Sequence, residues 1–278
     1  MHAGKNMGIM TTVKKTYCRK GQDPGVACRS YKAWALWLLG YPDQALQGMQ
    51  NALALAHTLS HPFSLVYALT YAARVHQLRR EGLEAQAQTE AAMALATAQR
   101  FAQWVAQATI LRGWALAEQG QSDEGLAQMR QSLATYGTTG AQVLRPYFLA
   151  MVARAYGTGG QAEEGLAALE EALAAVDKTG ERFYEAELYR LQGELLLDRS
   201  VEHDTEAEAC FRHALDIARR QEAKSLELRA AMSLARLWQP QGKRKEAHDL
   251  LAPIYGWFTE EFDTADLQEA KTLLEALA

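Results

Sequence analysis

Cysteine and proline are scarce in this sequence, and no stretch of it stays apolar for long. The 278 residues include three cysteines (Cys18, Cys28 and Cys210) and six prolines. So sparse and odd a set of cysteines, with no CxxC pair, fits a reducing compartment and argues against a disulfide framework. The longest apolar run, Ala33 to Leu39, is far too short to cross a membrane. We therefore expect a cytoplasmic protein with no membrane segment and no secretory signal.

Charge and motifs exclude further classes of function. Acidic residues outnumber basic ones by 33 to 29, and no dense basic block is present to neutralise nucleic-acid phosphates. HExxH, GxSxG and GxxxxGK[ST] motifs are all missing, and the seven histidines are scattered. The run Gly157-x-Gly159-x-x-Ala162 mimics a dinucleotide-binding loop, but a predicted helix precedes it where a strand is needed, so it indicates a turn. We expect no catalytic residue, no metal, no cofactor and no nucleic-acid partner.

The sequence does contain a repeated helical pattern. Abundant Ala, Leu, Gln and Glu favour helix. An apolar helix ends at glycine, a short polar turn follows, and a second helix begins. These turn glycines recur at intervals of about 40 residues, with one double interval: Gly40, Gly82, Gly120, Gly160 and Gly242. The missing unit falls at 198–207, where the glycine is lost and the turn is about two residues longer. Glycine just past a helix end takes the left-handed conformation without steric cost.

Each second helix opens with a small residue. Five positions after the turn glycine stand Ala45, Ala87, Gly125, Gly165 and Ala247. Here we expect the two helices of a unit to cross closely, and an apolar stripe at helical spacing follows. This arrangement resembles the tetratricopeptide repeat (TPR), whose signature is W-x2-L-G-x2-Y followed by A-x3-F-x2-A. The resemblance implies an all-α, right-handed superhelical solenoid of about six antiparallel helix pairs. A HEAT-like array is the alternative.

We predict one solenoid over residues 26–278. Its helix pairs are expected at 26–57, 63–97, 101–136, 142–177, 181–220 and 223–257, and a C-terminal capping helix at 264–277. Residues 1–25 are expected to be flexible or part of a preceding repeat. This asymmetry suggests that the chain is the C-terminal part of a longer protein.

Several longer stretches carry a second resemblance. Residues 23–46, 180–197, 206–238 and 250–277 resemble the C-terminal helical repeats of large bacterial signalling proteins. Those proteins join a nucleotide-cyclase or DNA-binding output domain to a regulatory ATPase and then to such an array. The resemblance covers nearly all of residues 23–277. It implies a sensor or scaffold arm, with catalysis in covalently linked ATPase or cyclase domains.

In the TPR family the first helices of the pairs line a concave groove, which implies where a partner binds. The register gives eleven candidate groove residues: Trp34, Trp37, His76, Arg79, Trp114, Tyr147, Arg154, Arg190, Glu194, Arg229 and Arg236. Trp, Tyr and Arg are common interface anchors. Two other interpretations stay open. Arg190 can pair with Glu187 or Glu194 on its own helix, and the tryptophans can pack between helices.

The expected function is a non-catalytic scaffold that holds a protein or peptide segment in the groove, in a bacterial signalling protein. The alternative is a small-molecule sensor, with a ligand inside the superhelix near Trp114, Tyr147 and Arg154. Self-association into a homodimer is a further prediction, because an N-terminal pair without a cap would expose apolar surface.

Overall fold

The described chain is helical throughout. The computed structural model describes residues 21–141, 143–260 and 262–278, and these ranges contain no strand. The α-helices, in chain order, are α2 (Pro24–Leu38), α3 (Pro42–Leu59), α4 (Pro62–Leu78), α5 (Gly82–Ala98), α6 (Ala102–Glu118), α7 (Ser122–Thr138), α8 (Arg145–Thr158), α9 (Ala162–Thr179), α10 (Glu185–Arg199), α11 (Asp204–Arg220), α12 (Lys224–Trp238), α13 (Arg244–Tyr255) and α14 (Ala265–Leu277). A short 3-10 helix, η1 (Val201–His203), lies between α10 and α11. The predicted fold class, six antiparallel helix pairs with a C-terminal helix, is confirmed. Of the predicted N-terminal segment 1–25, residues 1–20 lie outside the described residues.

Left-handed residues end the helices at regular intervals. Within the first four pairs the positive φ angles fall at Gly40, Arg80, Gly120 and Gly160. Between pairs they fall at Ser60, Arg100, Gly140 and Gly180, and also at Leu144, directly before α8. The second pair therefore turns at Arg80 (φ 66°), and Gly82, which the sequence pattern placed in that turn, is the first residue of α5. Its buried small residue is Ala85, and the predicted Ala87 is exposed. The prediction was wrong here because Arg80 accepts a conformation that glycine supplies elsewhere.

The irregular turn near residue 200 is confirmed. There η1 replaces the glycine turn, and Ser200 is extended, with φ −172°. The next left-handed residues are Glu222 and Gly242, each displaced by two positions from the earlier 20-residue spacing. The Gly157-x-Gly159 run also proves to be a turn, since α8 precedes it and α9 follows it.

Glycine sets how closely the helices of a pair approach. A Cβ atom on Gly125 would lie 2.3 Å from the carbonyl oxygen of Gly113, and one on Gly113 would lie 2.6 Å from the carbonyl oxygen of Gly125. A larger residue at either position would push α6 and α7 apart. In the fifth pair, Gly193 faces the ring of Phe211 in the same way, with 2.5 Å between the added Cβ and the nearest ring carbon.

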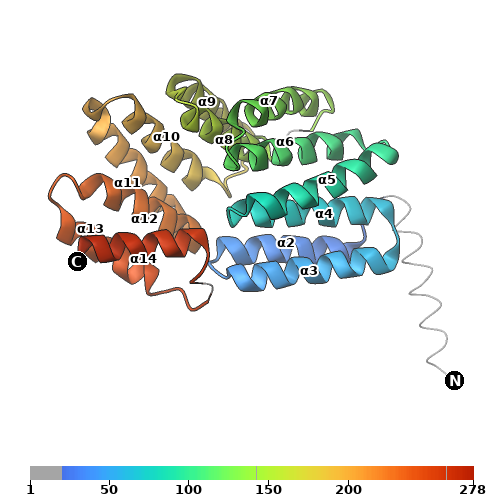
Figure 1. Cartoon of the computed structure of the whole chain (residues 1–278), viewed down its shortest axis with the longest axis horizontal. Coiled ribbons are helices and arrows are strands. Elements are labelled where there is room, and N and C mark those ends of the chain that lie inside the picture. The colour runs from blue at the N-terminus through green and yellow to red at the C-terminus, as the bar shows by residue number, and fades with distance from the viewer. Residues whose placement is uncertain (1–20, 142, 261) are drawn as a thin grey trace.

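The superhelix closes on itself. Figure 1 shows α12 and α14 next to one end of α2 and α3, and α12 contacts α2, so that the first and last pairs meet. The hydroxyl of Ser225 on α12 donates to the carbonyl oxygen of Trp37 at 2.5 Å. At Gly40, after α2, an added Cβ would lie 2.6 Å from the ring of Trp257. The array is therefore a ring of helix pairs with two mouths, formed by the two ends of the first helices.

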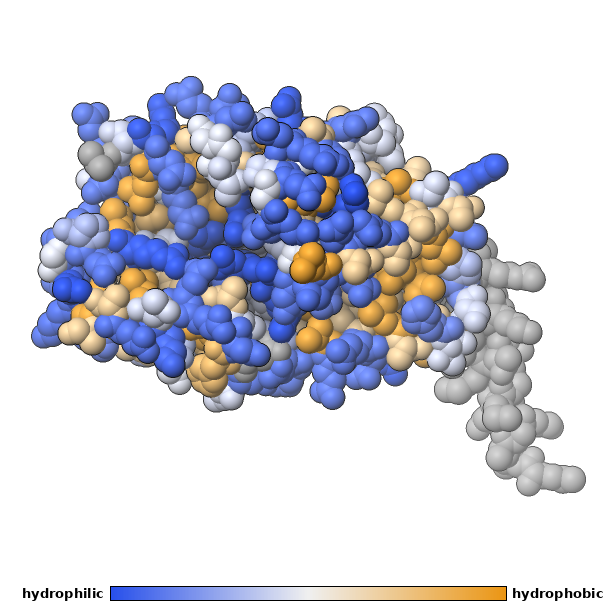
Figure 2. All heavy atoms as spheres, viewed as in Figure 1, coloured by the Kyte–Doolittle hydropathy of each residue, from blue (hydrophilic) through white to orange (hydrophobic). Residues whose placement is uncertain are grey.

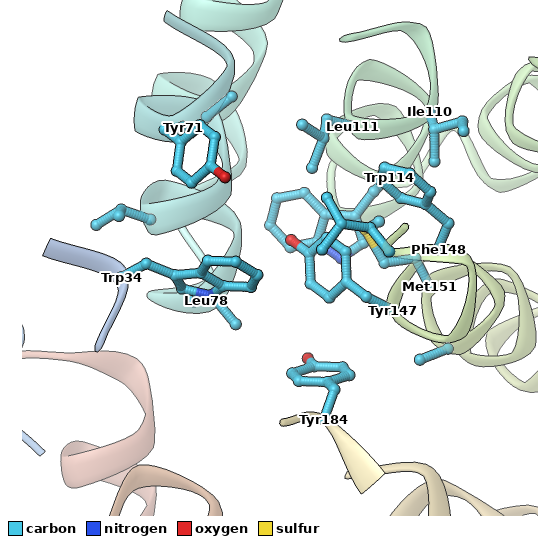
Figure 3. Close-up of a cluster of buried hydrophobic side chains, with 14 of the residues drawn as sticks. Trp34, Tyr71, Leu78, Ile110, Leu111, Trp114, Tyr147, Phe148, Met151 and Tyr184 are labelled. Carbon is cyan, nitrogen blue, oxygen red and sulfur yellow. The ribbon is translucent and has the colours of Figure 1, made fainter. Parts of the chain in front are cut away.

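The first helices turn their side chains toward the centre of this ring. In Figure 3, Trp34 from α2, Tyr71 from α4 and Tyr147 from α8 point toward one another. The phenol of Tyr147 is fully buried and donates to the Oε1 atom of Gln77 at 2.6 Å. Burial of such large rings contributes several kcal/mol each, on the order of 25 cal/mol per Å². The inner wall is thus a packed core over much of its length.

Helix length and hydropathy give no membrane span. No helix in the ranges 21–141, 143–260 and 262–278 is both long and apolar enough to cross a bilayer.

Candidate functional site

The aromatic residues predicted to face a groove are buried. Trp34, Trp37, Trp114 and Tyr147 are between 0% and 8% exposed. Closure of the ring covers them, and Trp34 meets Phe183 edge-on with 4.6 Å between ring centroids. These side chains pack between helices, which was the alternative interpretation of the tryptophans. The described part of the ring offers no open aromatic groove.

His76 and Arg79 belong to a small polar cluster at the end of α4. His76 Nδ1 lies 2.5 Å from one carboxylate oxygen of Glu81, and Arg79 Nε lies 2.7 Å from the other. Arg79 also donates to the carbonyl oxygen of Pro42 at 3.1 Å, which ties the second pair to the first. Burial alone would raise the pKa of Glu81, but His76 and Arg79 hold it below its usual value. The cluster joins two turns and leads away from the ring centre.

The remaining five predicted residues come together in one cavity, the charged pocket. Arg154, Arg190, Glu194, Arg229 and Arg236 all line it. Its volume is about 220 Å³, and it opens at the mouth formed by the C-terminal ends of α8, α10 and α12. The other lining residues are Arg80, Gly157, Thr158, Leu191, Leu195, Asp198, Met232, Asp266 and Glu269. Charged side chains therefore surround an apolar floor.

Two arginines of the charged pocket are fixed in ion pairs. The Arg190 guanidinium binds both carboxylate oxygens of Glu187 at 2.8 Å and also contacts Glu194. Both acids are on the same helix as Arg190, so the predicted pairing within one helix is present. Arg229 binds Asp266 at 2.8 Å and donates to the carbonyl oxygen of Leu78 at 2.6 Å. Burial would raise the pKa of the Glu187 carboxyl, yet Arg190 and Arg229 keep it below the usual value. These ions are structural, because breaking a buried pair leaves an uncompensated charge.

Arg154 and Arg236 are the accessible cations of the pocket. Their side chains are 28% and 45% exposed. Arg154 pairs with Glu118 at 3.0 Å, and Arg236 pairs at 2.8 Å with Glu269, which also pairs with Arg80. Exposed pairs of this kind contribute only about 0–1 kcal/mol, so a ligand carboxylate can replace the internal one at little cost. Asp198 lies at the same mouth and forms no ion pair with any described residue. Its partial burial, and to a lesser extent the negative charge of Glu194, raise its pKa.

Little room exists at the position predicted for a small ligand. Trp114 and Arg154 do line a common cavity, together with Tyr184, but its volume is only about 10 Å³. That space holds about one water molecule. The described part of the chain therefore offers no chamber for a metabolite between Trp114 and Arg154.

Sequence reasoning missed the half of the pocket that the ring closure supplies. Arg80 binds Glu269 at 2.6 Å and Asp266 at 3.3 Å, although α4 and α14 are far apart in the chain. Arg80 takes the turn position that glycine takes in other pairs, so the glycine pattern did not identify it as a turn residue. No local sequence pattern relates Arg80 to α14. The available signal was the pair of acidic residues, Asp266 and Glu269, in the first turns of the C-terminal helix.

The lining of the charged pocket combines charged and aliphatic side chains. It contains arginines, carboxylates and aliphatic side chains, with neither a cysteine nor a histidine among its lining residues. Within the described residues, no group of three or more His, Cys, Asp or Glu side chains is placed to hold a metal ion. Such a site can bind a charged group beside an apolar one.

Comparison by sequence gives no relative. No family model matches this chain, and no curated protein matches it.

Comparison by structure gives helical-repeat proteins at low sequence identity. The apo form of RapI is similar over 94% of this chain and 89% of its own, with a TM-score of 0.61 and 10% identity. Aspartyl phosphate phosphatase F from Bacillus subtilis is similar over 84% of this chain and 60% of its own (TM-score 0.58, 12% identity). A signal transduction ATPase with numerous domains from Pyrococcus horikoshii, which carries a tetratricopeptide repeat sensor, is similar over 90% of this chain and 38% of its own (TM-score 0.52, 12% identity). The chain has the fold of tetratricopeptide-type repeat proteins.

Proposed function

We propose that this protein is a non-catalytic interaction module that holds a segment of a protein partner at the charged pocket. The observation that carries the proposal is the pairing of two accessible arginines, Arg154 and Arg236, with an apolar floor that includes Leu191, Leu195 and Met232. Arginine beside aliphatic surface is a frequent anchor of protein interfaces. The partner segment would place an acidic side chain against the arginines and an apolar side chain on the floor.

The size of the pocket favours a peptide segment over a metabolite. Small-molecule sites usually enclose about 300–1,000 Å³, whereas the charged pocket has about 220 Å³ and opens to the surface. One or two side chains of a longer segment fit such a space. A small-molecule sensor is the second candidate, and it would require the ring to open around Trp114.

A place in a signalling protein is a further part of the proposal. The TPR sensor of the Pyrococcus horikoshii ATPase has the same fold, and that repeat array is one part of a longer chain. We propose that this chain is likewise a sensor or scaffold arm in the bacterial cytoplasm, next to linked ATPase or cyclase domains. Homodimer formation remains a prediction that sedimentation would test.

The experiment is a peptide selection against the purified protein. A displayed library of random 12-residue peptides should yield binders that combine Asp or Glu with Leu, Ile or Phe. The double variant Arg154→Glu/Arg236→Glu should weaken these binders by tenfold or more. Arg190 and Arg229 are unsuitable for this test, because their replacement would break the buried network.

Two further variants give the controls. Arg130→Glu reverses a single charge on the exposed face of α7, at a residue that does not line the pocket, and should leave peptide affinity unchanged. Asp198→Asn removes the unpaired carboxylate at the mouth and should strengthen binding of acidic peptides. The proposal fails if the selection yields no binder, or if its binders tolerate the double variant as well as they tolerate Arg130→Glu.

A further inference from the structure

Arg74 is a buried cation without a counter-ion. It lies near the middle of α4 and is 1% exposed, yet it forms no ion pair with any described residue. Its Nη2 atom donates to the Oε1 atom of Gln107, while Nε and Nη1 have no hydrogen-bond partner. Moving a charged group out of water without a partner costs several kcal/mol of free energy, so the buried position of the Arg74 guanidinium needs an explanation.

Aromatic rings surround the Arg74 guanidinium. Its central carbon lies 4.4 Å from the ring centroid of Tyr71 and 5.9 Å from that of Trp34. These cation–π contacts offset part of the desolvation cost. They satisfy no hydrogen-bond donor, however, and the indole Nε1 of Trp34 is a further buried donor without an acceptor. The cluster therefore presents several donors and lacks a matching acceptor.

An acid that interacts electrostatically with Arg74 has its own hydrogen-bond partner. Glu181, in the turn between α9 and α10, accepts the backbone N–H of Leu144 with both carboxylate oxygens at 2.9 Å. Burial raises the pKa of the Glu181 carboxyl and the charge of Arg74 opposes that rise, but the two side chains form no ion pair. Inside the described ring, no side chain supplies the anion that the Arg74 guanidinium would bind.

Tyr31 lies at the surface of the aromatic cluster around Arg74. The Tyr31 ring covers that of Tyr71 with 5.2 Å between centroids, and it is 53% exposed. Beyond it, half-buried Phe63 and Trp104 extend the aromatic surface outward, with 5.7 Å between their ring centroids. Figure 2 shows apolar side chains gathered at this N-terminal end of the molecule. For a ligand to reach Arg74 from this side, the Tyr31 side chain would have to move.

We propose that Arg74 binds the carboxylate of a ligand that enters beside Tyr31 and packs its apolar part against the Tyr71 and Trp34 rings. The ligand class is a carboxylate joined to an aromatic or aliphatic group, supplied either by a small organic acid or by the C-terminus of a peptide. Arginine matches a carboxylate through two parallel hydrogen bonds. Nε and Nη1 of Arg74 have no partner, and Nη2 has a second N–H besides the one given to Gln107, so Nη2 together with Nε or Nη1 can supply the two bonds. This site shares no residue with the charged pocket and does not depend on the function proposed there.

The test is calorimetric titration of the full chain with two acids and their neutral counterparts. Benzoate is compared with benzamide, and N-acetyl-alanyl-phenylalanine with its C-terminal amide. We expect at least one of the two acids to bind saturably and its neutral counterpart to bind at least tenfold more weakly. Binding of benzoate alone identifies a small acid as the ligand class, and binding of the peptide acid alone identifies a peptide C-terminus.

Variants separate a binding role from a structural one. Arg74→Met should abolish acid binding and raise the melting temperature, because it removes a buried charge that has no partner. Arg74→Lys keeps the charge and should retain weakened binding. The pocket variant Arg154→Glu/Arg236→Glu should bind acids as the wild type does, which keeps this test independent of the charged pocket. The inference is overturned if neither acid saturates, if acids and neutral compounds bind equally, or if Arg74→Met lowers the melting temperature.

Discussion

The guanidinium of Arg229 on α12 donates to the carbonyl oxygen of Leu78 at the end of α4, over a distance of 2.6 Å, although 151 positions separate the two residues in the chain. Arg229 also binds Asp266 on α14, and Arg80 after α4 binds the same carboxylate. One buried group of charges therefore joins the second pair, the sixth pair and the C-terminal helix. This closure converts an open repeat array into a ring.

Asp266 should be the residue on which this closure depends most. The Asp266→Asn substitution removes the charge shared by Arg229 and Arg80, and breaking buried pairs of this kind costs about 3–5 kcal/mol. We expect the urea midpoint to fall accordingly. Asp263→Asn, three positions earlier on the exposed surface, is the matched control and should change stability by less than about 0.5 kcal/mol. Equal midpoints for the two variants would contradict the role assigned to Asp266.

The same carboxylate predicts a dependence of stability on acid pH. Burial would raise the pKa of Asp266, but Arg229 and Arg80 hold it below its usual 3.8. Because the pKa is lower in the folded chain than in the unfolded chain, the charged form stabilises the fold fully above about pH 4. That contribution is lost as the pH falls through the lower, folded-state pKa. The free energy of unfolding of the wild type should fall more steeply below pH 4 than that of Asp266→Asn. The same dependence on pH in both proteins would contradict the role assigned to the Asp266 carboxylate.

The glycine contact between α6 and α7 gives a matched pair of substitutions in one helix. Gly125→Ala places a Cβ 2.3 Å from the Gly113 carbonyl oxygen, and such overpacking costs about 1–3 kcal/mol. Gly137→Ala meets only a flexible Arg145 nitrogen at 3.9 Å and should stabilise the helix by about 0.5–1 kcal/mol. Thermal unfolding should thus shift in opposite directions for the two variants. A stabilising Gly125→Ala would show that the helices do not cross as closely as described.

Asp198 should oppose folding at neutral pH. Burial and the nearby Glu194 raise its pKa, so the folded chain retains the proton at pH values where the unfolded chain has lost it. Protonated Asp198 therefore favours the folded chain at low pH, and this contribution to the free energy of unfolding is lost as the pH rises through the raised pKa. Asp198→Asn should raise the melting temperature at pH 7 and leave it unchanged near pH 3. A lower melting temperature at pH 7 would contradict this sign.

The local features of the fold follow from the sequence. Turn glycines such as Gly120 and Gly160, and the small residues that follow them, identify helix pairs because their effects act within one unit. The same periodicity placed Arg190, Arg229 and Arg236 on one face of their helices, and all three line the charged pocket.

The closure could not be predicted from the same pattern. Contacts such as those of Arg229 with Leu78 depend on the small rotation that each repeat adds, summed around the whole ring, and no single unit encodes that sum. For this reason Trp34 and Trp114 were expected in an open groove and are buried instead. Arg74 did carry a local signal, as the one charged residue within the apolar stretch from Phe63 to Val75.

The distance between the two ends of the array tests the ring most directly. Spin labels would be placed at Gln47 on α3 and Gln268 on α14, both exposed, in a variant whose three cysteines are replaced by serine. Pulsed electron–electron double resonance in dilute solution should give one short, narrow distance distribution, because α12 contacts α2 where the ring closes and Figure 1 shows α14 next to one end of α2 and α3. A broad distribution at long distances would show an open superhelix and would contradict the closed ring.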